Sequence, residues 1–186
     1  MAHVRQLSTK ELEQGLEHIE ASPRNNGELK LIVYRPDVDQ RHSVAEGLLD
    51  EEHGLVGDNW LTRGSRHMPD GAADPEMQLN IMNSRVAELV ADGTERMPLA
   101  GDQLYLDMNL SEENLPPGTQ FQLGEAILEV TEPPHTGCKK FAARFGNDAV
   151  IFVNSGYGKT QNFRGICAKV AKGGAIRVGD VATKIS

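Results

Sequence analysis

Residues 133–140 read PPHTGCKK, and they place one of the chain's two cysteines where a thiol can react. Two prolines exclude a helix before the cysteine, whereas Thr136 or Gly137 can cap a helix that begins at Cys138 or Lys139. A helix N-terminus carries partial positive charge, and two lysines directly after the cysteine add more. This setting favours the thiolate, which serves proteins as a nucleophile, a metal ligand or a sulfur carrier.

The alternative interpretation of Cys138 is a small buried hydrophobe, as most protein cysteines are. Its neighbours argue against this, because Pro, His, Gly and Lys do not make a core environment. Cys167 lies in the apolar run 165–170, which is typical of a strand, and we expect it to be structural. Two cysteines form no disulfide framework, and His135 with Cys138 alone provides too few ligands for a structural zinc site.

Charge is distributed unevenly along the chain. Residues 1–132 carry 10 Lys and Arg against 25 Asp and Glu, a net charge of −15, whereas residues 133–186 carry 9 against 2, a net charge of +7. The overall charge of −8 argues against nucleic acid as a partner. The basic segment is either a solvated face that balances an acidic one, or a pocket for an anionic ligand beside the thiol.

Three basic side chains are candidates for such a pocket. Arg144 follows the cysteine by one to two helical turns, Lys159 lies in a glycine-rich segment, and Arg164 precedes a strand. We expect Arg164 to hold an anion with two donors, and Arg177 to be a solvent-facing charge. Of the six histidines, His135 alone has a position suited to catalysis.

The glycine-rich segment 155–160 reads SGYGKT and ends like a phosphate-binding loop. That motif needs a glycine where Val153 stands, and the following residues run into a strand rather than a helix. We therefore interpret the segment as a loop that offers Lys159, and not as a nucleotide site.

Elements that position these residues follow from spacing and turn signals. A capping box at residues 8–11 and apolar residues at helical spacing predict a helix over 9–20. Further helices are expected over 84–91 and from the cysteine to Gly146, and strands over 29–34, 78–82, 119–123, 126–131, 165–171 and 175–178. Short strands with close turn signals after residue 98 favour an antiparallel barrel or sandwich.

We therefore predict an α+β fold that is mainly β with a few short helices. The length suits a single domain over residues 1–186, in which 1–27 form an N-terminal helix and lead-in. The loop 63–76 is expected to be flexible. The start of the chain lacks a hydrophobic signal core, and no apolar run approaches the ~20 residues of a membrane helix, so we expect a cytoplasmic protein with no membrane partner.

A series of short segments between residues 101 and 180 carries a resemblance to a known family. They are GDQL at 101–104, LPPGT at 115–119, LGEAILEV at 123–130, Cys138 with the RFG at 144–146, RGI at 164–166 and GAIRVGD at 174–180, with weaker echoes at 54–58 and 78–82. In this order and spacing they resemble the MOSC domain, named for the C-terminal domain of molybdenum cofactor sulfurase. Many members have Gly-Glu-Asn at 101–103 and proline at 137, where this chain has Gly-Asp-Gln and glycine.

The resemblance implies an antiparallel β-barrel whose Cys138 binds molybdenum or carries sulfur for the molybdenum cofactor (molybdopterin). The basic segment would then bind the pterin phosphate. The residues expected to bind the cofactor are His135, Thr136, Lys139, Lys140, Arg144, Lys159 and Arg164. No pyridoxal-phosphate domain like that of fused members is visible in the chain.

Two functions remain open from the sequence. The first is a small molybdenum oxidoreductase that reduces N-hydroxylated small molecules and takes electrons from a separate donor protein, since no haem, flavin or iron–sulfur motif is visible. The second is a carrier that holds a persulfide from a sulfur donor on Cys138 or delivers the cofactor. A barrel that no longer binds cofactor is the third possibility.

Overall fold

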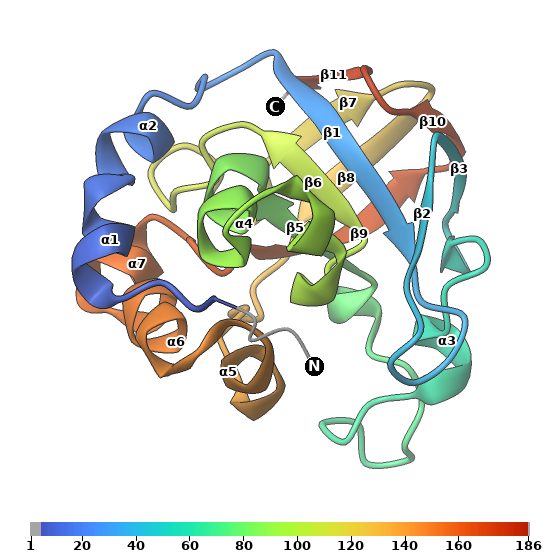
Figure 1. Cartoon of the computed structure of the whole chain (residues 1–186). Coiled ribbons are helices and arrows are strands. Elements are labelled where there is room, and N and C mark those ends of the chain that lie inside the picture. Colours follow the sequence, from blue (N-terminus) through green and yellow to red (C-terminus); the bar gives the residue numbers. More distant parts are fainter. Residues whose placement is uncertain (1–4, 186) are drawn as a thin grey trace.

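The computed structural model describes residues 5–185, which form a β-barrel with short helices packed against it (Figure 1). Its helices are α1 (Thr9–Gln14), α2 (Leu16–Glu20), α3 (Trp60–Arg63), η1 (Pro75–Met77), α4 (Ser84–Ala91), η2 (Thr94–Ala100), α5 (Lys139–Phe145), α6 (Asn147–Asn154) and α7 (Gly156–Thr160). Its strands are β1 (Gly27–Tyr34), β2 (His42–Val44), β3 (Glu46–Asp50), β4 (Gly54–Leu55), β5 (Leu79–Asn83), β6 (Leu104–Asp107), β7 (Gln120–Leu123), β8 (Ala126–Val130), β9 (Ile166–Lys172), β10 (Gly174–Arg177) and β11 (Val181–Lys184).

Seven strands close the barrel in the order β11-β7-β8-β9-β5-β6-β1, with β11 returning to β1 through the pair Gly27 and Ala182. Neighbouring strands in the barrel are antiparallel except β5 and β6, which run parallel with Ile81 opposite Leu104. The expected purely antiparallel barrel is therefore wrong, and the barrel is mixed. Parallel neighbours need a crossover, which α4 and η2 supply between the two strands.

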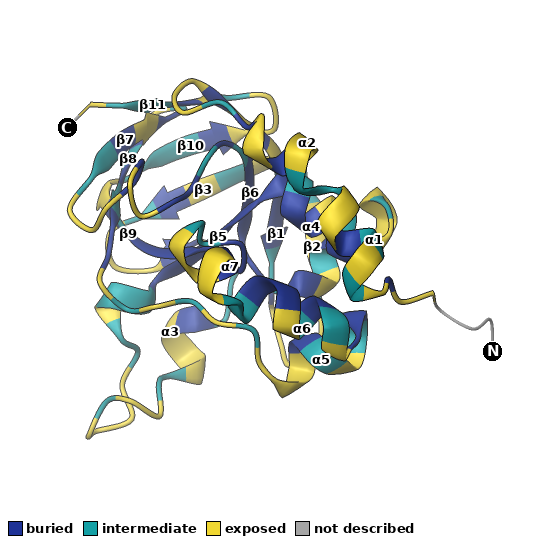
Figure 2. Cartoon of the chain, turned by 90° about the vertical axis from the view of Figure 1, so that its left-hand side faces the viewer, coloured by how far each residue is buried: buried dark blue, intermediate teal, exposed yellow. Residues whose placement is uncertain are grey.

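Two hydrophobic cores result from this arrangement. The barrel interior is filled by one face of each strand, for example Leu29, Ile81 and Leu128. The second core lies outside the barrel wall, where Met82 and Tyr105 meet apolar residues of the helices. Figure 2 shows the dark, buried faces of α4, α5 and α6 turned toward the strands. The helices on this side therefore fix the segments that follow the barrel strands, including the one that carries Cys138.

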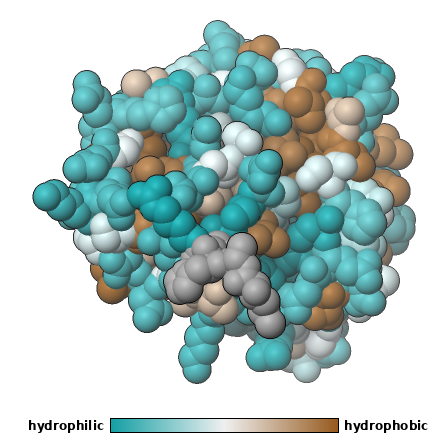
Figure 3. Space-filling model, in the orientation of Figure 1, coloured by the Kyte–Doolittle hydropathy of each residue, from teal (hydrophilic) through white to brown (hydrophobic). Residues whose placement is uncertain are grey.

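A smaller sheet of β10, β3 and β4 packs beside the barrel. The face drawn in Figure 3 is largely hydrophilic, with hydrophobic side chains gathered toward its upper right. Leu48, Val178 and Val181, on or next to the strands β3, β10 and β11, are among the exposed apolar residues of the chain. Within residues 5–185, no helix is long and apolar enough to cross a membrane.

Most elements expected from the sequence are present, with two differences. The helix expected over 9–20 is divided into α1 and α2 at Gly15, where an added Cβ would lie 2.5 Å from a methyl carbon of Leu89. The segment 155–160 is the short helix α7 rather than a loop, because the hydroxyl of Ser155 accepts a hydrogen bond from the Gly158 amide and caps it.

Gly165, directly before β9, should tolerate no side chain. Its φ is +115°, and an added Cβ would lie 2.4 Å from the Ile81 carbonyl oxygen. Gly179 is a matched control, since its φ is +97° but nothing lies within 4 Å of its Cβ position. We expect Gly165→Ala to lower the free energy of unfolding by more than about 2 kcal/mol and Gly179→Ala by about 1 kcal/mol in urea titrations. Equal losses of stability in the two variants would show that a Cβ at residue 165 does not clash with the Ile81 carbonyl.

Candidate functional site

Cys138 is exposed and directly precedes α5, so the helix begins where the sequence predicts. The Cys138 carbonyl accepts the amide of Ala142 at 3.0 Å, which is the first helical hydrogen bond. Phe141 and Phe145 are buried, with their ring centroids 4.8 Å apart, and they anchor α5 in the helix core. The thiol therefore lies at the surface, at the start of a helix that two buried aromatic side chains fix against the core.

The peptide before the cysteine is held by one side chain of α6. The Asn154 side chain accepts the Gly137 amide at 2.9 Å and donates to the Gly137 carbonyl at 3.0 Å. A Cβ on residue 137 would lie 3.0 Å from Val153, so the loop passes close to α6 there. Glycine at 137 fits this close approach, and Asn154 fixes the backbone that presents the thiol.

Asp102 connects three loops around the thiol. Its carboxylate is fully buried and accepts the Nη1 of Arg164 at 2.7 and 2.9 Å and the Nε2 of His135 at 3.0 Å. Arg164 also donates through Nη2 to the Ala100 carbonyl at 3.0 Å, and its guanidinium lies 4.9 Å from the centroid of the Phe141 ring. The buried charges are thus paired with one another and tied to α5.

These contacts determine the protonation states of Asp102 and His135. Burial alone would raise the pKa of Asp102, but the charges and hydrogen bonds of Arg164 and His135 outweigh it and lower this pKa. Burial lowers the pKa of His135, and the charge of Arg164 lowers it further. His135 is therefore neutral near pH 7 and donates its Nε2–H to Asp102, which leaves Nδ1 as an acceptor 3.4 Å from Nδ2 of Asn80.

A cavity of about 220 Å³ opens beside the thiol, and its wall is rich in cations. Its charged lining residues are Arg35, Arg41, Arg63, Lys140, Arg144 and Arg164, together with Asp37 and Asp39. Three of these arginines are paired: Arg164 binds Asp102, as described above. Arg35 binds Asp58 through two contacts of 2.7 Å, and Arg144 binds Asp39 at 2.8 Å. The wall therefore keeps an excess of positive charge.

Arg41 and Arg63 form no ion pair within residues 5–185, and their environment works against their charge. Loss of hydration lowers the pKa of Arg41, and the neighbouring charges of Arg144 and Arg35 lower it further. Loss of hydration also lowers the pKa of Arg63, with Arg35 adding to the effect. Arginine stays protonated even so, and like charges held this close attract an anion.

Unpartnered buried atoms gather at the same cavity. Across the described part of the chain, the buried side-chain nitrogen and oxygen atoms without a hydrogen-bond partner are Nε of Arg41, Nε of Arg164 and Oδ1 of Asn59. All three residues line the cavity beside Cys138. Buried polar groups are normally paired, so these atoms indicate a place for a ligand that brings acceptors and at least one donor.

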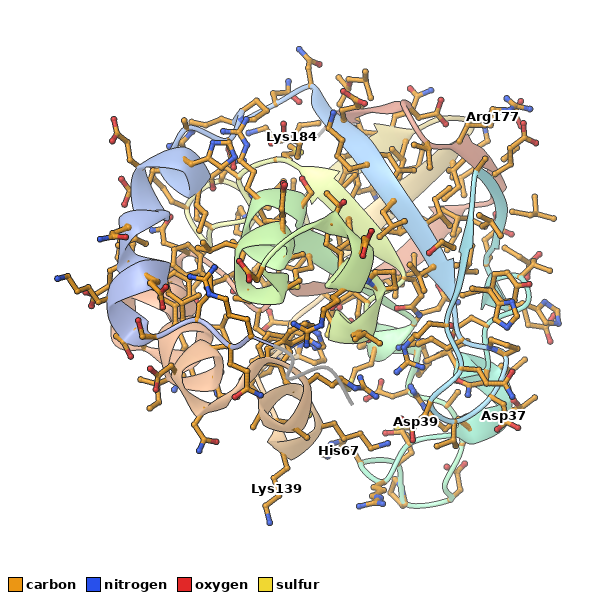
Figure 4. The ribbon with its side chains drawn as sticks, in the orientation of Figure 1. Asp37, Asp39, His67, Lys139, Arg177 and Lys184 are labelled. Atoms are coloured by element: carbon orange, nitrogen blue, oxygen red, sulfur yellow. The ribbon has the colours of Figure 1, made fainter. Side chains whose placement is uncertain are left out.

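The structure brings together part of the residue set expected from the sequence. Cys138, His135, Lys140, Arg144 and Arg164 line the same cavity. Two of the others, Thr136 and Lys159, line a neighbouring cavity of about 280 Å³, which shares His135 and Arg164 with the first. Figure 4 shows the side chain of Lys139 pointing away from the molecule.

The expected two-donor contact of Arg164 with an anion needs correction. Its two terminal nitrogens already donate to Asp102 and Ala100, so Nε is the nitrogen that remains. Arg35, Arg41 and Arg63 were not expected at the site, because the excess of basic residues in the sequence lies in residues 133–186. The only available signal was the weak echo at residues 54–58, which precedes Asn59 and α3.

A comparison with family models shows which protein family the chain belongs to. A family model described as MOSC domain matches residues 75–183, which is more than half of the chain. The chain belongs to the MOSC domain family. The matched part contains Asp102, His135, Cys138 and Arg164, whereas Arg35, Arg41 and Arg63 precede it.

Solved structures share the fold of this MOSC protein at low sequence identity. YiiM from Escherichia coli matches with a TM-score of 0.53 and 22% identity, over 86% of this chain and 70% of that one. YuaD from Bacillus subtilis matches with a TM-score of 0.58 and 14% identity, over 85% of this chain and 96% of that one. YiiM from Geobacillus stearothermophilus matches with a TM-score of 0.51 and 16% identity, over 87% of this chain and 73% of that one. No curated protein matches the chain.

The two thiols should differ greatly in reactivity. Cys138 is exposed, whereas burial raises the pKa of Cys167 to about 12. This leaves Cys167 with about a thousandth of the thiolate of an ordinary cysteine, in addition to its steric protection. We expect iodoacetamide to modify one thiol rapidly at pH 7.5 in the folded protein, and mass spectrometry to locate it at Cys138. Equal rates, or a rapid phase that persists in Cys138→Ser, would contradict this assignment.

The pairing of His135 predicts a pH dependence of stability. Its pKa is lowered from 6.5 in the folded protein, so the unfolded chain takes up a proton at a pH where the folded protein does not. The free energy of unfolding should therefore fall as the pH drops below 6.5, with this residue contributing up to about 1.4 kcal/mol per pH unit. The exposed histidines are common to both proteins, so the difference between wild type and His135→Gln in urea titrations from pH 5 to 7.5 isolates the effect. Identical slopes for the two proteins would refute it.

Proposed function

We propose that this MOSC protein binds the molybdenum cofactor in the cavity beside Cys138, with the Cys138 thiolate as the protein ligand of the metal. The observation that supports this is that Arg41, Asn59 and Arg164, each of which has a buried atom without a hydrogen-bond partner, all line the cavity that the thiol borders. A ligand with both an oxyanion and N–H groups would satisfy all of them, and a pterin phosphate has both.

The space between the cations fits an anionic group. A Cβ at Gly101 would lie 3.5 Å from Nη2 of Arg41 and 3.6 Å from Nη1 of Arg144, so the glycine keeps this position free between two guanidinium groups. Arg41 has no ion-pair partner in residues 5–185 and is the best candidate to bind the phosphate. Thiolate is a soft ligand, which suits a metal bound otherwise by sulfur.

When bound, the cofactor would supply two-electron redox chemistry at the metal. We propose that the protein uses it to reduce N-hydroxylated small molecules, a reaction that consumes two electrons and two protons and releases water. The cations of the cavity would hold the cofactor, and Asp102 would orient His135, which burial and the charge of Arg164 keep neutral, beside the substrate space. Electrons would come from a separate donor protein.

A second function uses the same thiol without reduction. Cys138 is exposed at the rim of the cavity, so a donor protein that itself carries a persulfide can reach it. The Cys138 thiolate would attack the outer sulfur of that persulfide, form the new S–S bond and release the donor cysteine as a thiolate. The two functions differ in their products. A reductase converts N–OH to N–H when supplied with electrons, whereas a carrier holds sulfur that cyanide removes and reduces nothing.

Molybdenum content tests the proposal. Protein purified from a cofactor-producing host should contain close to one molybdenum per chain, and Cys138→Ala should contain almost none. Arg41→Ala should weaken retention roughly ten- to a hundredfold, because it removes a charge-assisted contact of about 1.5–3 kcal/mol.

Arg177→Ala is the matched control for the arginine variant. Arg177 is exposed, pairs with Glu46 at 2.9 Å, and lies at the upper end of the molecule, far from the labelled residues near the thiol (Figure 4). It should retain molybdenum like the wild type at equal thermal stability. Equal retention by both arginine variants would remove the support for the anion site, and full retention by Cys138→Ala would reject the thiolate ligand.

A further inference from the structure

A second and larger cavity adjoins the one beside Cys138. It measures about 790 Å³, within the range of small-molecule sites, and lies under the loop that follows α3. The two cavities share Val38, Arg63, Asn80 and Lys140 as lining residues, so they are continuous. We call the larger one the outer chamber. The proposed role of Cys138 uses none of the residues that line this chamber alone.

The outer chamber combines positive charge with apolar surface. Arg63, Arg66 and Lys140 line it, and none of them forms an ion pair within residues 5–185. Asp74 is the one acidic residue among the described lining residues, so three cations face a single carboxylate. The chamber therefore has an uncompensated positive charge in a protein whose net charge is −8.

The apolar surface of the outer chamber comes from the loop that follows α3 and from residues outside that loop. Val38, Met68, Pro69 and Met77 line the chamber together with the cations. Figure 4 places His67 on the side of the loop that faces α5, and His67 also lines the chamber. Methionine side chains adapt to the shape of a bound apolar group, so this lining suits a ring or short hydrocarbon rather than a free inorganic ion.

We propose that the outer chamber binds an organic anion whose apolar or aromatic body lies against the methionines and whose carboxylate or phosphate is held by Arg63 and Arg66. The proposal rests on the proposed function in one respect, which is that it makes this anion the substrate that reaches the thiol cavity. In that case, the substrates are N-hydroxylated compounds that also bear a negative charge, distinct from the phosphate of the cofactor.

Three naphthalene probes of similar size separate charge from shape. 1-Naphthoate carries a carboxylate, 1-naphthyl phosphate a phosphate, and 1-naphthamide no charge. Isothermal titration of the protein at low salt should show at least one anion binding about tenfold more tightly than the amide, with the advantage lost at high salt. The stronger of the two anions identifies the head group. Equal affinity for all three probes would overturn the proposal.

Arg66→Ala locates the binding, because Arg66 is exposed on the loop and its loss should leave the fold intact. It should reduce the affinity for the anion about tenfold and leave the affinity for the amide unchanged. Arg177→Ala, the distant control, should change neither, and Asp74→Asn should strengthen anion binding. If Arg66→Ala and Arg177→Ala behave alike, the anion binds elsewhere and the proposal fails.

The outcome is independent of molybdenum content. If protein from a cofactor-producing host contains no molybdenum but binds the anion in a way that depends on Arg66, the chamber is supported and the cofactor proposal is rejected. A protein that retains molybdenum but binds the three probes equally would support the cofactor proposal and reject the chamber. Loss of anion binding when the cofactor is loaded would show that the cofactor itself fills the chamber, and would overturn the inference.

Discussion

The carboxylate of Asp102 is completely buried, and the arrangement of the site depends on how its charge is paired. Arg164 and His135 both bind it, from loops that are far apart in the sequence. A buried pair of this kind adds little net stability over apolar packing, but breaking it leaves an unpaired charge at a cost of about 3–5 kcal/mol. The pairing therefore acts mainly as a constraint: the segment that presents Cys138 is held in one position relative to the turn at Gly101 and the start of β9.

The mixed barrel supplies the frame for this constraint. Because β5 and β6 are parallel, the chain crosses over through α4 and η2 and returns at the turn before β6, which places Asp102 beside the cavity. The loop after β1 contributes Arg35 and Arg41, and α3 contributes Arg63. One cavity thus collects residues from six separate segments of the chain. Within this cavity lining, Arg41 and Arg164 each keep an unpartnered nitrogen and Asn59 keeps an unpartnered oxygen.

The sequence predicts the parts of this site that depend on local rules. The helix after Cys138, its end at Gly146 and the structural role of Cys167 follow from caps, apolar spacing and strand pattern. The parallel pair was missed because strand direction is set by the crossover and leaves no mark within a strand. The two-donor contact expected of Arg164 has a similar cause: a buried arginine looks the same in sequence whether its terminal nitrogens bind a ligand or a buried Asp102. The net charge of each segment also gave a wrong expectation for the basic pocket, since Arg35, Arg41 and Arg63 line the cavity but lie in the acidic part of the chain.

The central claim is that the Cys138 thiolate and the unpartnered donors around it bind a single ligand between them. The most direct measurement is a crystal structure of the protein loaded with molybdenum cofactor, with diffraction data collected at the molybdenum absorption edge. We expect one anomalous peak within bonding distance of Sγ of Cys138, and a phosphate oxygen about 3 Å from Nε of Arg41. A molybdenum peak away from Cys138, or a phosphate that leaves the arginines of the cavity without a partner, would contradict the account.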